Sequence, residues 1–270
     1  MLRPFTILRQ SFDLVRSQRS LWGAAAVLGL AQSSGLLLPP PSLGQPAAGL
    51  LALPVLVLLL GLGVVAVAAT NSLLALATDH ALGGALPAGQ AWRRGWACWW
   101  SVLGLGLLLG LLFALPYLVL IGAFLLFVHI GFSQPGFTFW IALASLPLTL
   151  VYAPLSGVGQ CRVVVAYQAA GDALGQAWRL YRAHPRELTG MALLLLVLPG
   201  LTGLIPLTGM WLVQAGPNFV PLRVLLFPLA WLLAAAGSAW TLAAWALVHL
   251  ELLPPDPPPA ATDAPVSLPT

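Results

Sequence analysis

Charge is the property that this sequence has least of. Charged side chains make up 7% of its 270 residues, whereas hydrophobic residues make up 60% and the mean hydropathy is +0.95. Soluble domains carry about 25% charged residues. A water-soluble globular protein is therefore excluded by composition alone.

Lysine is absent as well: all eleven basic residues are arginines, set against seven acidic residues. These charges are clustered, and residues 20–78, 95–161, 188–222 and 224–250 contain none. A hydrocarbon core about 30 Å thick needs roughly 20 apolar residues per helical crossing, so these stretches accommodate two, two, one and one crossings respectively. The sequence predicts an all-α polytopic integral membrane bundle with six transmembrane helices.

The six predicted spans are bounded by charges and prolines. The first ends at Pro39-Pro40-Pro41, because proline lacks the N–H that continues a helix. Pro185 disfavours helical geometry at His184 and predicts a bend before the fifth span. Asp172 is the predicted N-cap of the segment that precedes this bend. The spans themselves cover about 21–38, 49–78, 100–130, 137–160, 185–213 and 223–250.

Residues that commonly carry catalysis or ligate metals are few and scattered. Ser156 lacks the preceding glycine of a nucleophile elbow, and no spacing of histidine, cysteine or carboxylate fits a metal site. No ionisable side chain lies in the interior of a predicted span, away from its ends, which disfavours a proton-coupled carrier, because such carriers relay protons through buried groups. The sequence predicts a protein without enzymatic activity and without a cofactor.

The two cysteines and two of the histidines lie at the edges of apolar stretches. Cys98 and Cys161 are each close to an arginine, which places both on the cytoplasmic side in the predicted topology. This location favours free structural thiols over a disulfide. His129 lies at the predicted outer edge of the third span and His249 at the inner edge of the sixth, too far apart to ligate one haem. We interpret both histidines as interfacial, with their polar ends among lipid headgroups; ligation of a pigment by His129 alone is the alternative.

Arginine and tryptophan gather in the segments that precede the spans. Residues 4–19 predict an amphipathic helix that lies on the membrane surface, and residues 92–100 and 172–185 repeat its mixture of arginines and large apolar side chains. Indole rings favour the headgroup layer, so the predicted interfacial aromatics are Trp92, Trp96, Trp99 and Trp178. The candidate lipid-headgroup contacts are Arg9, Arg16, Arg19, Arg93, Arg94, Arg179, Arg182 and Arg186.

These arginines have two interpretations of equal weight. Each contributes about 1 kcal/mol to binding near an anionic leaflet, or they only fix the topology. With both termini in the cytoplasm, ten of the eleven arginines fall inside and only Arg223 lies near the outer surface, in accord with the positive-inside rule. We predict a multi-pass protein of the cell membrane with both termini cytoplasmic. Its pI near 9.7 points to membrane phosphates rather than nucleic acid, because no basic folded domain lies outside the bilayer.

A pentapeptide repeats within the chain. Gly89-Gln90-Ala91-Trp92-Arg93 recurs as Gly175-Gln176-Ala177-Trp178-Arg179, and Gln10-Ser11-Phe12-Asp13 has a related pattern. Repeated local chemistry at a long period indicates repeated supersecondary structure. The sequence predicts three tandem parallel units, each an amphipathic helix followed by a transmembrane hairpin, at about 7–78, 86–168 and 172–250. Together they form a six-span domain over 1–253, followed by a disordered proline-rich cytoplasmic tail at 254–270.

Two rows of small residues predict close helix packing. One is Gly106 with Gly110, and the other is Ala235, Ala239 and Ala243. Packing within the monomer is the favoured interpretation of both rows, and a dimer interface is the alternative.

The arrangement resembles a broad group of poorly characterised prokaryotic six-span proteins, related to the membrane domain that precedes the catalytic domain of some glycerophosphodiester phosphodiesterases. The resemblance covers most of residues 5–250. It is carried by Ala91-Trp92-Arg93 leading into Ser101-Val102-Leu103-Gly104, and by residues 172–180 leading into Leu188-Thr189-Gly190. It implies a non-catalytic membrane module; phosphodiesterase activity does not transfer, because no catalytic barrel follows Leu250.

Three functions are compatible with these features. The favoured one is a non-enzymatic polytopic membrane protein that organises lipid or a partner protein at the cytoplasmic leaflet. The alternatives are the permease subunit of an ATP-driven exporter and an accessory subunit of a redox or photosynthetic membrane complex. The expected partners are membrane lipids, with a membrane protein or a second copy of the chain as further partners.

Overall fold

The computed structural model describes residues 3–33, 47–129, 134–197 and 220–252, and these ranges are helical without any strand. This confirms the all-α prediction for the described residues. The helices are α1 (Pro4–Ser17), α2 (Arg19–Ser33), α3 (Ala47–Ala81), α4 (Ala88–Ala97), α5 (Trp99–His129), α6 (Gln134–Ala166), α7 (Ala170–Ala183) and α9 (Val220–Leu252), and residues 185–197 are helical too.

Four helices are long and apolar enough to cross a membrane. Their candidate spans are Leu60–Ala81 in α3, Trp99–Ala123 in α5, Leu143–Ala166 in α6 and Leu226–Leu252 in α9. They overlap the second, third, fourth and sixth predicted spans, which is consistent with a multi-pass membrane protein. The predicted spans at 21–38 and 185–213 run partly through residues outside the described ranges, as do the Pro39-Pro40-Pro41 stop and the predicted tail.

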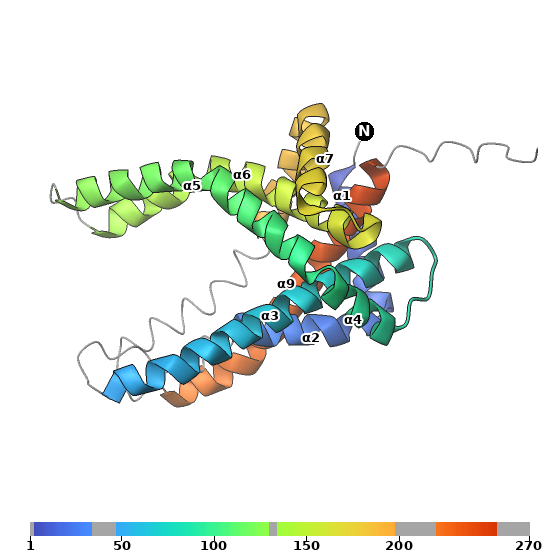
Figure 1. Ribbon diagram of the computed structural model, residues 1–270, viewed down its shortest axis with the longest axis horizontal. Helices are drawn as coiled ribbons and strands as arrows, with labels where there is room; N and C mark the ends of the chain where they lie inside the picture. Colours follow the sequence, from blue (N-terminus) through green and yellow to red (C-terminus); the bar gives the residue numbers. More distant parts are fainter. Residues whose placement is uncertain (1–2, 34–46, 130–133, 198–219, 253–270) are drawn as a thin grey trace, which may run out of the picture.

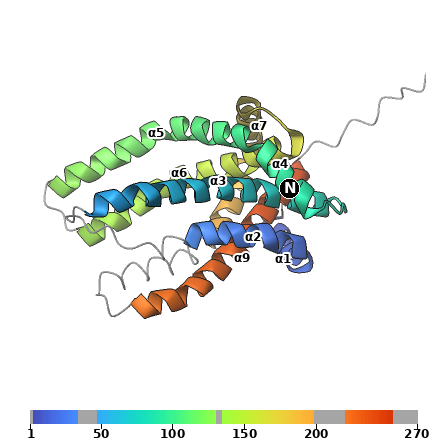
Figure 2. The same cartoon turned by 60° about the horizontal axis from the view of Figure 1, so that its bottom comes forward.

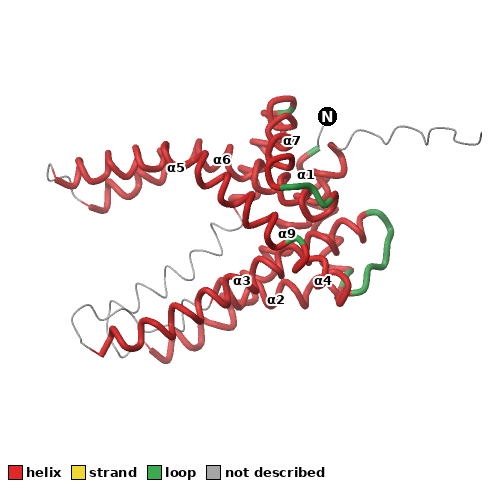
Figure 3. The backbone as a smooth tube through the Cα atoms, in the orientation of Figure 1, coloured by secondary structure: helices red, strands yellow, loops and turns green. Residues whose placement is uncertain are grey.

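The short helices gather at one end of the molecule. Figures 1 and 2 both show α1, α4 and α7 at this end, together with the end of α9, while the long helices extend away from it. Two arms result, one made of α5 beside α6 and the other of α3 with α2 and α9 (Figure 1). The described loops are short, and the longest, residues 82–87 between α3 and α4, lies beyond the gathered helices (Figure 3).

Helix α3 is the centre of the bundle. Every residue from Ala68 to Thr78 is buried except Thr70, which is half-buried, because α2, α4, α6 and α9 all pack against this helix. Two of its buried polar side chains form hydrogen bonds within the helix: the hydroxyls of Ser72 and Thr78 donate to the carbonyls of Ala68 and Leu74, at 2.7 Å each. Apolar packing and internal hydrogen bonds thus suit α3 to a protein-lined environment.

The alanine row of α9 packs inside the chain, as predicted. Ala235, Ala239 and Ala243 are at most 3% exposed. Gly29 of α2 explains the close approach, since a Cβ at this glycine would lie 2.7 Å from the carbonyl oxygen of Trp231 and 2.8 Å from the amide nitrogen of Ala235. Small residues on both helices therefore bring the two backbones together.

The glycine pair of α5 behaves differently. Gly106 and Gly110 are exposed, and a Cβ at either would meet no described atom within 4 Å. The prediction that this pair packs within the monomer is wrong for the described residues. Glycine spacing alone does not say whether a partner helix is present.

The proline and capping predictions have mixed outcomes. His184 is a non-helical break and the helix resumes at Pro185, as predicted. Asp172 is not the N-cap: α7 begins two residues earlier, with Ala169 as its N-cap, and Asp172 lies in the first turn. A carboxylate there still interacts favourably with the positive end of the helix dipole.

Candidate functional site

Three short helices at one end of the bundle, α1, α4 and α7, form the candidate site. Each stops at a single non-helical residue, after which the chain is helical again. The break residue donates its backbone N–H to the carbonyl four residues earlier in every case. The pairs are Gln18 with Leu14 (3.1 Å), Cys98 with Arg94 (3.1 Å) and His184 with Leu180 (2.9 Å).

The breaks fall at the same place in the three segments that the sequence aligns. The aligned small residue lies seven positions before the break each time, and its exposure is 0% for Ser11, 0% for Ala91 and 1% for Ala177. The charged residue two positions after it is exposed in every copy: Asp13, Arg93 and Arg179. Burying a small residue lets a short helix lie close to the bundle while the neighbouring charge faces outward.

The predicted headgroup contacts lie mainly on the outside. Arg94 is half-buried, and the seven other candidates are exposed: Arg9, Arg16, Arg19, Arg93, Arg179, Arg182 and Arg186. The ion pair found among the described residues joins His184 and Glu187, at 3.3 Å, and involves none of these arginines. Their guanidinium groups are therefore available to external anions.

Arg94 has a structural role. Its Nε and Nη2 atoms donate to the carbonyls of Val164 and Val165, at 2.9 and 2.7 Å, and its guanidinium carbon lies 4.6 Å from the ring centre of Tyr167. The last carbonyls of a helix lack intrahelical partners, so Arg94 caps the carboxyl end of α6. Tyr167, which follows that end, adopts a left-handed backbone conformation with φ of 52°.

The predicted interfacial aromatics form pairs. Trp92 and Trp96 meet edge to face with ring centres 6.4 Å apart, and Trp178 stacks on Tyr181 at 6.2 Å. Trp96 and Trp178 remain 42% and 41% exposed, whereas Trp99 is half-buried against Trp100. Partial exposure at the end of a bundle is the environment that amphipathic indole rings favour.

Helix α4 is held against α3 by backbone contact. The Nδ2 atom of Asn71 donates to the carbonyl of Gly95 at 3.1 Å, and Asn71 is fully buried. A Cβ at Gly95 would lie 2.5 Å from the carbonyl oxygen of Ala68 and against the Ser72 hydroxyl. Glycine is needed here because two helical backbones are in direct contact.

Helix α1 is held against α9 by one tryptophan. The Nε1 atom of Trp240 lies 3.0 Å from the carbonyl of Leu8 and 2.8 Å from the Ser11 hydroxyl, to which it donates. The Trp240 ring also meets Phe12 edge to face, with ring centres 6.0 Å apart. Buried Ser11 thus has a partner, and its place in the aligned segments has a physical reason.

A cavity of about 350 Å³ lies between α2, α3 and α4. It is lined by Ser20, Gly23, Ala24, Val27, Ser72, Leu76, Ala88 and Trp92. At its edge the Ser20 hydroxyl lies 3.0 Å from Nε2 of His80, whose Nδ1 lies 3.1 Å from the carbonyl of Gly84. These contacts join the start of α2 to the turn that follows α3. We call this cavity the α2–α4 groove.

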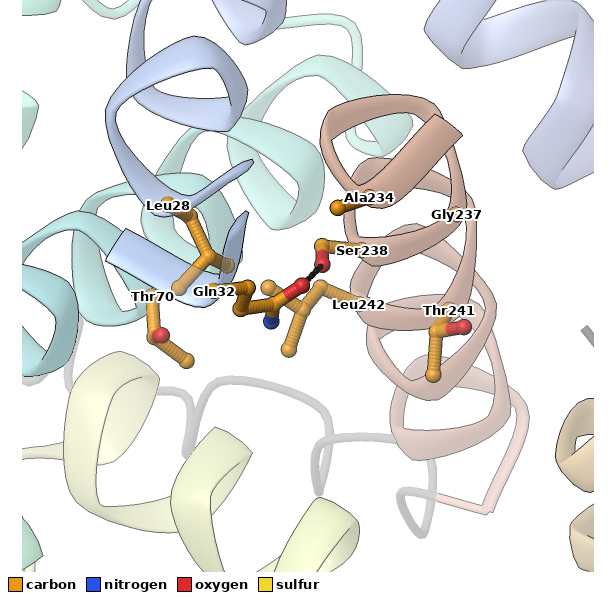
Figure 4. Close-up of a pocket in the computed structure, with 8 residues that line it drawn as sticks. All are labelled: Leu28, Gln32, Thr70, Ala234, Gly237, Ser238, Thr241 and Leu242. Atoms are coloured by element: carbon orange, nitrogen blue, oxygen red, sulfur yellow. Dashed lines mark hydrogen bonds between the residues drawn. The ribbon is translucent and has the colours of Figure 1, made fainter. Parts of the chain in front are cut away.

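A second cavity, of about 250 Å³, lies between α2, α3 and α9 (Figure 4). Its polar lining residues come from three helices, and one pair is in contact: Ser238 lies 3.2 Å from the Oε1 atom of Gln32. Thr70 and Thr241 add two hydroxyls, and Leu28, Ala234, Gly237 and Leu242 complete the wall. Sequence reasoning missed this cluster because it searched the spans for ionisable groups only.

The histidine and cysteine predictions divide. His129 is exposed. His249 is 1% exposed and its Nδ1 is buried without a partner, so the prediction that His249 reaches the headgroups is wrong.

Cys98 and Cys161 are free and buried, as predicted. Burial raises the pKa of the Cys98 thiol above its usual value, although nearby Arg94 opposes the shift. The part of the chain that is described holds no cluster of metal-ligating side chains.

Comparisons of the chain with known protein families, with curated proteins and with solved structures found no match. The resemblance to the membrane domains of phosphodiesterases therefore stays a prediction.

Proposed function

We propose that this protein is a non-enzymatic, polytopic membrane protein that organises anionic lipid at the cytoplasmic leaflet. In this proposal it consists of three units, each a surface helix followed by a transmembrane hairpin, so that six spans place the three surface helices on one side. The recurring break in α1, α4 and α7, seven positions after a buried small residue, is the observation that carries it.

The physical argument runs from this geometry to lipid. A bundle end that carries exposed arginines and half-exposed tryptophans matches the headgroup layer, where phosphates pair with guanidinium groups and indole rings lie at the boundary. A surface helix fixed to the bundle by its small face keeps its charges in one plane. Three such helices would hold anionic lipids in a defined arrangement beside the protein.

Topology is tested by cysteine labelling. Single cysteines replace Arg9, Arg93 or Arg179 in a Cys98→Ser, Cys161→Ser background, with Arg223→Cys as the matched control. A membrane-impermeant maleimide should label the first three only from the cytoplasmic side and the control only from outside. Labelling of Arg93→Cys and Arg179→Cys from opposite sides would refute the three-unit arrangement.

Lipid selectivity is tested by purification in mild detergent followed by lipid mass spectrometry. Replacing Arg179 and Arg182 of α7, together with Arg186 just after the His184 break, by glutamine should lower the ratio of copurified anionic to zwitterionic phospholipid. Retention of the full ratio, or turnover by the wild-type protein in a hydrolase assay, would contradict the proposal. Copurification of an ATPase would favour the exporter alternative.

A further inference from the structure

The α2–α4 groove is lined by both polar and apolar side chains. Ser20 lies at the start of α2 and Val27 lies seven residues further along, so the groove extends roughly 10 Å along this helix, at 1.5 Å per residue. Its polar lining comes from Ser20, Ser72 and the indole of Trp92, and its apolar side chains are those of Ala24, Val27, Leu76 and Ala88.

Two exposed arginines are next in sequence to residues that line the groove. Arg19 immediately precedes Ser20 and Arg93 immediately follows Trp92, and both arginines are exposed. Helix α4 also begins at the groove, at Ala88, so the positive end of its dipole lies there. No described carboxylate pairs with either arginine. Asp79, which precedes His80 in the sequence, accepts the backbone N–H of Leu86 at 2.7 Å.

The groove is open and of suitable size. Gly23 and Ala88 are exposed at its rim, while Ser72 and Leu76 of α3 are buried and form its floor. Its volume of about 350 Å³ falls within the range of roughly 300 to 1,000 Å³ found for small-molecule sites. Most of the lining residues are apolar, so a free phosphate would leave this part of the groove unfilled, whereas a phospholipid supplies both a phosphate and an acyl chain.

We infer that the α2–α4 groove binds one anionic phospholipid, with its phosphate between Arg19 and Arg93 and the upper part of an acyl chain against Ala24, Val27 and Leu76. This inference rests on the proposed function and makes it specific, because it assigns one lipid to one position. The hydrogen bonds from Ser20 through His80 to Gly84 hold the rim in place.

Gly23 provides the sharpest test. A Cβ at Gly23 would meet no described atom within 4 Å, so Gly23→Leu fills the groove without displacing backbone. The matched control is Gly106→Leu in α5, where a Cβ likewise meets no described atom within 4 Å and the residue does not line the α2–α4 groove. Native mass spectrometry of protein from nanodiscs with equal parts of phosphatidylglycerol and phosphatidylcholine should show loss of the tightly bound phosphatidylglycerol for Gly23→Leu only.

Charge is tested separately. Arg19→Gln and Arg93→Gln should each weaken phosphatidylglycerol binding roughly fivefold, the change that corresponds to about 1 kcal/mol. Arg9→Gln and Arg16→Gln in α1 are the controls, since both arginines are exposed and neither adjoins the groove. Equal losses from the two pairs would overturn the assignment to the groove.

The failures of the two proposals are distinguishable. If Gly23→Leu keeps its phosphatidylglycerol while the variant with glutamine at positions 179, 182 and 186 loses lipid selectivity, the groove assignment is wrong and the general function stands. If neither variant changes the bound lipid, both are wrong. Should Gly23→Leu not fold, Gly23→Cys in the cysteine-free background replaces it: phosphatidylglycerol should slow its reaction with maleimide, and unchanged reactivity would overturn the inference.

Discussion

Helices α3 and α5 are both long and strongly apolar, yet they face different environments. Half of the most apolar stretch of α3 is buried within the protein, against 17% for α5. Along α3 the residues from Ala68 to Ser72 are small or polar, whereas α5 presents leucines at positions such as Leu107, Leu111 and Leu115, which are 63 to 74% exposed.

This difference shows what hydropathy measures and what it leaves out. Large apolar side chains suit a surface that faces lipid, because lipid tails offer no specific partner. Small and hydroxyl-bearing side chains permit close helix contact and internal hydrogen bonding. A span rich in leucine is therefore a candidate for the lipid-facing side. A span with an alanine, threonine, asparagine and serine run belongs in the centre of a bundle.

The largest expected difference between the two helices comes from replacing one leucine on each by alanine. Leu74→Ala in α3 should destabilise the protein by about 2 to 5 kcal/mol, because Leu74 is 1% exposed and its removal leaves a cavity. Leu111→Ala in α5, at a residue 74% exposed, should change stability by less than about 0.5 kcal/mol. Unfolding in a mild detergent measures both, and equal losses would remove the distinction between the two helices.

Glycine substitutions extend the comparison to the backbone. Gly95→Val in α4 forces its side chain against the α3 backbone and should cost about 1 to 3 kcal/mol. Gly106→Val in α5 has open space around it and should cost nothing measurable, because valine has a higher helix propensity than glycine. Thermal unfolding separates the two, and a tolerant Gly95 would show that α4 is not held against α3.

A smaller effect is expected at the cap of α6. Arg94→Gln loses two hydrogen bonds to helix-terminal carbonyls and should destabilise the protein by about 1 kcal/mol, because the group is only half-buried. Its neighbour Arg93 is exposed and makes no such bonds, so Arg93→Gln is the matched control. Thermal unfolding measures both variants. If they show equal stability, Arg94 behaves as an exposed surface charge and does not cap α6.

The smallest perturbation is chemical and leaves stability unchanged. Burial raises the pKa of Cys98, so less thiolate is present at any pH from about 7 to 9, and alkylation should be slow across that range. Cysteine at exposed position 97, from Ala97→Cys with Cys98→Ser, should react at the rate of an ordinary thiol. Comparable rates for the two thiols would show that the junction of α4 and α5 opens readily.

The sequence was sufficient to predict the helical class, the positions of four long apolar helices and the bend at His184. These follow from local properties: charge spacing, apolar length and the backbone limits of proline. It was also sufficient to align Ser11, Ala91 and Ala177, although the reason for a small residue there, burial against the bundle, required the structure.

Other features depend on contacts between distant segments. The pairing of Arg94 with carbonyls about 70 residues later, and the groove formed by three helices, have no signature in local sequence. The same limit explains the errors. His249 lies at the edge of an apolar stretch, where histidines often reach headgroups, but neighbouring helices bury it. Gly106 and Gly110 have the spacing of a packing motif without a described helix against them.

Asn71 has a consequence for biogenesis. Its amide partner, the carbonyl of Gly95, belongs to a segment 24 residues further along the chain, so α3 is synthesised before that partner exists. A polar amide facing hydrocarbon is unfavourable. The final packing of α3 therefore depends on translation of α4, because the acceptor for the Asn71 amide becomes available only then.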